Sequence, residues 1–337
     1  QGVGPLAISG LAITFTFMNL GAAIGAMVGV GASTVTAMEL GKKNYAKSCR
    51  ALANTIMLNI IFGILFTVTC LLFLKPILYF FGASDQTLPY AFEYMQVILL
   101  GNIITHLYHG LNSVLRASGH PNEAMIATII TVIANIFLDW LFIYPLGMGI
   151  RGAAIATVLA QTLPLIYLVK IFSNKNELVH FDKKDFVFDI KIIKDILAIG
   201  LSPFLLNTAL CVIIILINKG LKEFGGDLSV GAYGIVNRVT FFFTMIVMGI
   251  TQGMQPIVSY NYGARQFSRV TEALKKAIFL AFITLCLGCL IGESIPRFVC
   301  RLFTTDEELL NYSIDGMRIV MATFPIISMP IVIGNFF

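Results

Sequence analysis

Long apolar stretches alternate with short polar segments along the whole chain. Nine of these stretches, each of about 20 residues or more, cover approximately 6–36, 52–74, 88–115, 123–144, 153–172, 196–218, 229–258, 273–292 and 312–337. Each is long enough for an α-helix to cross about 30 Å of hydrocarbon. The sequence lacks the period-two alternation of a β-strand, and helices satisfy their backbone polar groups within lipid. The pattern therefore predicts an all-α polytopic membrane protein.

The composition supports this class. Hydrophobic residues make up 57% of the 337 residues and charged residues 12%, with a mean hydropathy of +0.86. This leaves too little polar surface to coat a soluble globule of this size. The six cysteines have no histidine at metal-ligand spacing, so Cys286 and Cys289 are interpreted as small residues in a helix interface. No metal site and no cofactor are expected.

Basic residues are distributed unevenly between the two sets of loops that alternating spans would create. Loops 37–51, 116–122, 170–195 and 259–276 hold 4, 1, 6 and 4 Lys or Arg, 15 in all, whereas the opposite loops hold six. Positive residues favour the cytoplasmic side, so the first set of loops is predicted to be cytoplasmic. The net charge of +5 then reflects topology, and no nucleic-acid partner is expected.

The chain contains an internal repeat. Laying Gly4–Met95 over Gly226–Met317 without a gap aligns Gly31 with Gly253. The same register pairs the loop that starts at Glu39 with the loop that starts at Asn261, keeping its glycine, a basic residue two positions later and the following aromatic residue. Two similar halves are predicted, an organisation that many transporters use to build a central site.

The segments outside the aligned copies predict the domain organisation. Segment 196–218 precedes only the second copy, and segments 123–144 and 153–172 follow only the first. The whole protein is therefore expected to have two pseudo-symmetric six-helix lobes. About nine helices are expected in this chain, with the first helix, the end of the tenth and the last two outside it. The predicted parts are an amino-terminal lobe at 1–173, a cytoplasmic linker at 174–195 and a carboxy-terminal lobe at 196–337, acting as a monomer.

One carboxylate within an apolar stretch is the main candidate for chemistry. Ionisable groups in hydrocarbon are costly, which makes each one a functional candidate. Asn135 and Asp139 are four residues apart, so they share one face of a helix, where an amide and a carboxylate can hold a cation or share a proton. The alternative is an Asp139 near the outer end of its helix that contacts lipid headgroups or Arg151.

Two further residues are candidates for a substrate cavity. Arg238 lies about ten residues into its segment, or roughly 15 Å along a helix, where it either repels or anchors a substrate. The alternatives for Arg238 are a pair with Asp315 or a side chain that extends to the interface. His106 and His109 are three residues apart, which suits either a proton relay or neutral histidines hydrogen-bonded between helices.

The segment from Asn135 through Asp139 to Thr157 resembles the fifth-to-sixth-helix signature of multidrug and toxic compound extrusion (MATE) transporters of the bacterial multidrug-exporter branch. Further matches are Val114–Gly119, Gln255–Pro256, Tyr260–Ala264 and Gly334–Asn335. The resemblance implies a V-shaped pair of lobes in the inner (cytoplasmic) membrane that exports organic cations in exchange for H⁺ or Na⁺. It also implies that Asn135, Asp139 and Thr157 couple transport to the ion. Tyr94 matches a tyrosine that some members place near that site.

The sequence thus favours a secondary antiporter for small amphipathic cations. Abundant Phe (27), Met (13) and Tyr (11) residues suit flat apolar cations through buried area and cation–π contacts. A lipid-linked oligosaccharide flippase of the same superfamily is the alternative, but it would need several cationic cavity residues, and only Arg238 qualifies. An enzyme would need a paired nucleophile and base, or clustered metal ligands, within the helices. A channel would need a ring of polar residues that lines a pore. Neither pattern is apparent in the sequence.

Overall fold

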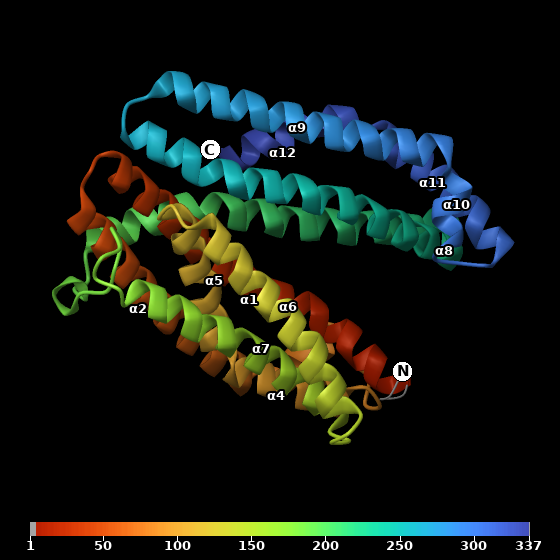
Figure 1. The fold of residues 1–337 in the computed structure, drawn as a ribbon. Helices are drawn as coiled ribbons and strands as arrows, with labels where there is room; N and C mark the ends of the chain where they lie inside the picture. The colour runs from red at the N-terminus through yellow and green to blue at the C-terminus, as the bar shows by residue number, and fades with distance from the viewer. Residues whose placement is uncertain (1–4, 337) are drawn as a thin grey trace. The chain divides into compact units, whose positions relative to one another are not determined.

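The computed structural model describes residues 5–336, apart from some side chains within α1 and α8, and every regular element in this range is helical (Figure 1). The elements are α1 (Pro5–Gly41), α2 (Tyr45–Leu72), α3 (Leu74–Phe80), α4 (Leu88–Leu100), α5 (Asn102–Ala117), α6 (Pro121–Ile143), α7 (Gly149–Phe172), η1 (Lys183–Asp185), α8 (Ile190–Gly263), α9 (Phe267–Ser294), α10 (Pro296–Arg301), α11 (Glu307–Ala322) and α12 (Phe324–Phe336). The predicted all-α class is confirmed.

Six helices in the described part of the chain are long and apolar enough to cross a membrane, or seven if α11 and α12 form one span bent by 56°. Two of the nine apolar stretches are interrupted rather than continuous. Stretch 88–115 divides at Gly101 into α4 and α5, and stretch 312–337 divides at Thr323 into α11 and α12. Stretch 196–218 forms part of α8, in which Gly226 has a left-handed φ of 66° before the span Leu228–Gly263.

The helix boundaries confirm the internal repeat. In the register that aligns Gly4 with Gly226, the ends of α1 and α8 coincide at Gly41 and Gly263, and α2 and α9 begin at Tyr45 and Phe267. The turns between them share an uncommon conformation, since Lys43 and Arg265 occupy equivalent positions with φ values of 61° and 59°. The breaks at Gly101 and Thr323 also coincide. Apolar composition alone does not produce such agreement, so the two segments share one fold.

The chain divides into two compact units, residues 1–204 and 205–337. In unit 1, α1 packs on α2, α4 and α5, while α7 packs on α4, α5 and α6. Its largest core cluster joins α1, α2, α5 and α7, and includes the fully buried side chains of Leu52, Leu111, Leu115, Leu168 and Phe172. In unit 2, α9 packs on α10, α11 and α12 around Phe324, Met317 and Leu285.

The first turns of α8 belong to unit 1. Ile192 and Ile196 are fully buried in the unit 1 core. Gly31 of α1 and Gly200 of α8 allow the two backbones to meet, because a Cβ at Gly31 would lie 1.9 Å from the Ile196 carbonyl oxygen, and one at Gly200 would lie 1.9 Å from that of Met27. Glycine is thus the residue that permits this helix contact on both sides.

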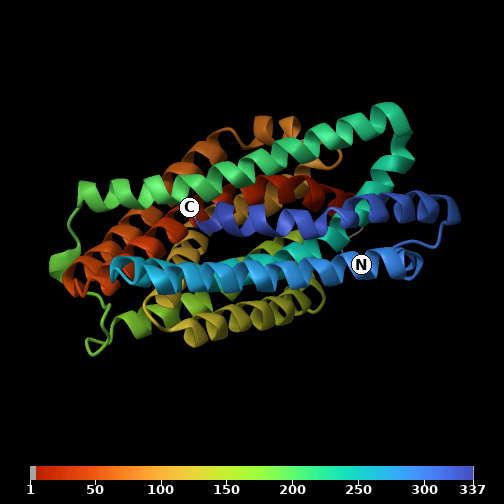
Figure 2. The same ribbon diagram turned by 90° about the horizontal axis from the view of Figure 1, so that it is seen from above.

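The segment that joins α7 to α8 lies beside the α1–α2 turn in both views (Figures 1 and 2). The fully buried side chain of Asn54 on α2 binds this segment. Its Nδ2 donates to the Val187 carbonyl at 3.1 Å, and its Oδ1 accepts from the backbone N–H of Asp189 at 3.1 Å. His120, before α6, makes a second contact, with its Nε2 2.9 Å from Glu177 Oε2.

Asn54→Ala is expected to release this segment. The substitution leaves the Val187 carbonyl and the Asp189 amide without their side-chain partner, at a cost of about 1–3 kcal/mol for each group that stays buried. Limited trypsin digestion should then cut faster after Lys183 and Lys184. Asn176→Ala, an exposed change in the same segment, is the control. Equal cleavage rates in the wild type and Asn54→Ala would show that Asn54 does not hold the segment.

Candidate functional site

The inward face of α6 carries the two polar residues singled out in the sequence. Asp139 and Asn135 are partly buried, one turn apart, whereas Ile136, Phe137 and Trp140 on the other face are exposed. The helix packs most extensively against α7. The large apolar side chains of this part of α6 thus point outward, and the carboxylate of Asp139 points toward the neighbouring helices. This pattern is typical of a functional site inside a helical bundle.

A buried tyrosine of α4 lies near Asp139. Tyr94 is close enough to Asp139 and to Thr157 of α7 for an electrostatic interaction. The Thr157 hydroxyl itself donates to the Ala153 carbonyl at 3.0 Å, one turn earlier. Tyr94 thus comes near two residues that are distant from it in sequence, and Asn135 lies one turn from Asp139 on α6.

The polar contacts continue along α7 into residues that the sequence reasoning did not identify. Gln161 lies one turn after Thr157, and its side-chain oxygen accepts a hydrogen bond from Thr105 of α5. The signal in the sequence was the i, i+4 spacing of Thr157 and Gln161. Nothing in the sequence pointed to Thr105, because its partner lies on a helix distant in the chain.

The break between α4 and α5 positions both sides of this site. A Cβ at Gly101 would collide with the side chain of Val158, which is next to Thr157 on α7. Because glycine has no Cβ, α7 can approach the junction of α4 and α5. Tyr94 lies before the break and Thr105 after it, and both face α7. The absence of a side chain at Gly101 therefore permits the close approach of Val158 at this junction.

Two buried atoms at the site have unused hydrogen-bonding capacity. Asp139 Oδ1 and Asn135 Nδ2 are inaccessible and have no hydrogen-bond partner among the described residues. Leaving such a group unsatisfied costs about 1–3 kcal/mol. A protonated Asp139 supplies a donor, and a half-turn of the Asn135 amide presents its oxygen to a cation. The residues present thus fit either a proton or a small cation that prefers oxygen ligands.

The two predicted cavity residues have different surroundings. His106 is fully buried within unit 1, where its ring lies beside Gly21 and Gly25 of α1 and 6.5 Å from the Phe66 ring of α2. Arg238 is exposed on α8 in unit 2, and no ion pair with Asp315 occurs among the described residues. Their assignment to a substrate cavity stays a prediction.

A model of the MatE family matches residues 1–141 and 198–337 of the chain. The chain belongs to the MatE family. Among curated relatives, the multidrug export protein MepA of Staphylococcus haemolyticus is 27% identical over 316 residues, which cover 94% of this chain and 70% of the relative. MepA of Staphylococcus aureus is 26% identical over 317 residues with the same coverage.

Solved MatE-family structures share the fold along the whole chain. A MATE protein in complex with MaD3S superposes with a TM-score of 0.94 at 25% identity and covers 100% of this chain and 75% of that one. An outward-facing multidrug resistance MATE family transporter of the MOP superfamily gives 0.91 at 25% identity, covering 99% and 76%. The predicted family is confirmed, and this MatE chain is a multi-pass protein of the cytoplasmic membrane.

Proposed function

We propose that this protein is a secondary active antiporter that exports small amphipathic organic cations in exchange for H⁺ or Na⁺. The observation that carries the proposal is a partly buried carboxylate, Asp139, near the buried Tyr94 and with one oxygen that lacks a hydrogen-bond partner among the described residues. The multidrug export proteins among the relatives support the substrate class.

In the proposed cycle, the ion acts through the charge of Asp139. A charged carboxylate in low-dielectric surroundings is costly, and a bound proton or Na⁺ removes that cost. The loaded and unloaded forms then favour different packing of α6 against α7, which carries Thr157. An ion can shift a conformational equilibrium only by its difference in affinity for the two states, and Asp139 is the group proposed to provide this difference.

Ethidium accumulation in cells that express the full-length protein tests the proposal and identifies the ion. Cells with the protein are expected to keep their intracellular ethidium level low. Dissipation of the gradient of the coupling ion, H⁺ or Na⁺, should raise this level to that of cells without the protein. A protonophore and a sodium-free medium separate the two ions. Low ethidium with both gradients dissipated would reject antiport.

The flippase alternative has a different readout. A flippase for a phosphate-containing lipid-linked substrate needs cationic side chains around the substrate, and Asp139 would have no evident use in it. Cells dependent on such a flippase would be rescued by this protein, and their ethidium level would not change. The polar contacts around Asp139 favour the antiporter.

A further inference from the structure

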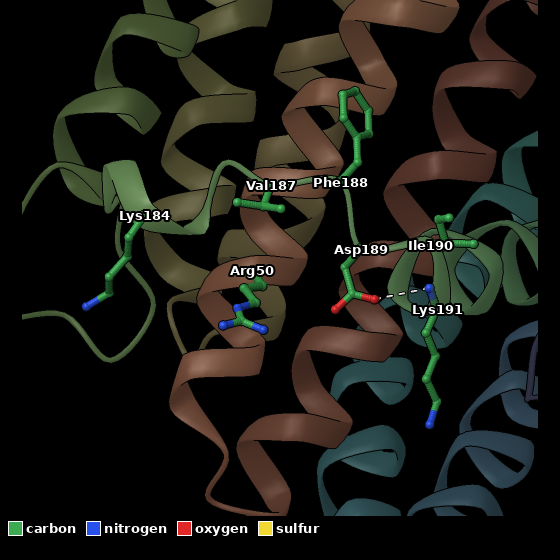
Figure 3. A pocket seen from close by; sticks show the side chains of 7 residues that line it. All are labelled: Arg50, Lys184, Val187, Phe188, Asp189, Ile190 and Lys191. Carbon is green, nitrogen blue, oxygen red and sulfur yellow. Dashed lines mark hydrogen bonds between the residues drawn. The ribbon is translucent and has the colours of Figure 1, made fainter.

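A pocket of about 410 Å³ lies at the predicted cytoplasmic end of unit 1 (Figure 3). Its walls come from Arg50 of α2, Lys184 of η1, residues 187–189 before α8, and Ile190 and Lys191 in the first turn of α8. It is separate in sequence from the Asp139 site, because none of its residues belongs to α4, α6 or α7. The residues around it combine cationic and apolar side chains.

Cations outnumber carboxylates on the pocket wall. Arg50, Lys184 and Lys191 line it together with a single carboxylate, Asp189. Asp189 Oδ1 caps the start of α8, since it accepts hydrogen bonds from the backbone N–H groups of Lys191 and Ile192 at 3.0 and 3.2 Å. The charge of Asp189 is thereby partly compensated by the helix terminus.

Two of these cations have acidic neighbours, Asp185 beside Arg50 and Asp182 beside Lys184. Arg50 Nε lies 3.8 Å from the buried Asp185, beyond the usual length of a hydrogen bond, and its side chain is 54% exposed. The hydrogen bond between Lys184 and Asp182, together with the charge of Asp182, raises the pKa of the Lys184 amine. Lys184 therefore stays positive at neutral pH, with its side chain 76% exposed.

The same segment exposes large apolar side chains. Val187, Phe188 and Ile190 are 62%, 57% and 68% exposed. In Figure 3, Phe188 points away from the charged ends of Arg50, Lys184 and Lys191. The apolar and cationic side chains of this segment thus point in different directions, and the segment lies at the ends of membrane spans. Such an arrangement is typical of the boundary between acyl chains and headgroups.

We propose that this pocket binds the headgroup phosphate of an anionic phospholipid of the inner leaflet. Arg50, Lys184 and Lys191 supply positive charge at the level of the headgroups, and Phe188 and its apolar neighbours enter the acyl region. A free phosphate ion would satisfy the cations but leave Val187, Phe188 and Ile190 in water, so the apolar side chains favour the lipid. The bound lipid would anchor the segment between α7 and α8 to the membrane surface.

Quenching of a tryptophan by brominated lipid tests the site in the full-length protein. Trp140, the single tryptophan of this chain, is replaced by Phe, and Phe188→Trp places the probe beside the pocket. The protein is reconstituted in mixed bilayers in which either phosphatidylglycerol or phosphatidylcholine carries the bromine, at equal proportions. We expect about a fivefold preference for phosphatidylglycerol at position 188, the effect of roughly one lysine or arginine near an anionic surface.

Matched charge removals identify the source of the preference. The pocket variant combines Arg50→Gln, Lys184→Gln and Lys191→Gln, and the control variant combines Arg265→Gln, Arg269→Gln and Lys275→Gln, exposed residues of unit 2. The pocket variant should quench equally with both lipids, while the control variant keeps the preference. Equal quenching in the wild type, or a preference that survives in the pocket variant, would overturn the proposal.

Two additions keep the test decisive. Val187→Trp, at a more exposed position of the same segment, replaces the probe if Phe188→Trp does not reach the membrane. Inorganic phosphate is added to the bilayers in a separate measurement, at constant ionic strength. Phosphatidylglycerol quenching should be unchanged, and its loss would show a site for free phosphate instead of a lipid.

Discussion

Asp139→Asn is expected to reduce gradient-driven ethidium efflux to the level of cells without the protein. Asparagine nearly keeps the size of the side chain, but it neither takes up a proton nor supplies negative charge to a cation. Under the proposed function, the ion gradient then loses its point of action, while the packing of α6 against α7 is preserved. Initial efflux rates after energisation, with protein levels measured in the membrane, provide the readout.

Glu93→Gln is the matched control for this variant. Glu93 lies one residue before Tyr94 on α4, also carries a carboxylate, and is exposed. Its substitution should leave efflux unchanged. Unaltered efflux by Asp139→Asn would remove Asp139 from the mechanism, and an equal loss in both variants would point to a general effect of lost negative charge in unit 1.

Gly31→Ala is expected to destabilise the protein strongly, by more than about 3 kcal/mol, at the upper end of the effects of overpacking. The new methyl group would lie 1.9 Å from the Ile196 carbonyl oxygen, and backbone atoms in the middle of two packed helices have no rotamer through which to escape. The first turns of α8 would have to move away from α1, opening the core around Ile192 and Ile196. Thermal unfolding of the detergent-solubilised protein, with its yield of monodisperse material, measures the effect.

The other side of the contact carries the matching test, because a Cβ at Gly200 would lie 1.9 Å from the Met27 carbonyl oxygen. Gly200→Ala should therefore destabilise the protein to a similar degree. Similar unfolding temperatures for Gly31→Ala and the wild type would show that the α1–α8 contact is looser than described.

Gly31 and Gly200 also show what the sequence does not reveal. No local pattern indicates that these two glycines lie against the backbone of another helix. Likewise, the i, i+4 spacing of Asn135 and Asp139 places them on one helix face, but Gln161 and Thr105 meet only because α5 and α7 pack together. The breaks at Gly101 and Thr323 fall within apolar stretches that read as continuous helices.

The amino-acid sequence by itself determined the class, the family and the repeat of this protein. Hydropathy and helical periodicity act over about 20 residues, and these local signals require no knowledge of neighbouring segments. Only the tertiary structure decided which polar groups meet Asp139, which glycine is crowded, and where cationic and apolar side chains form a pocket beside α8. Each of these depends on contacts between residues far apart in the chain, and helix packing, not helix formation, creates those contacts.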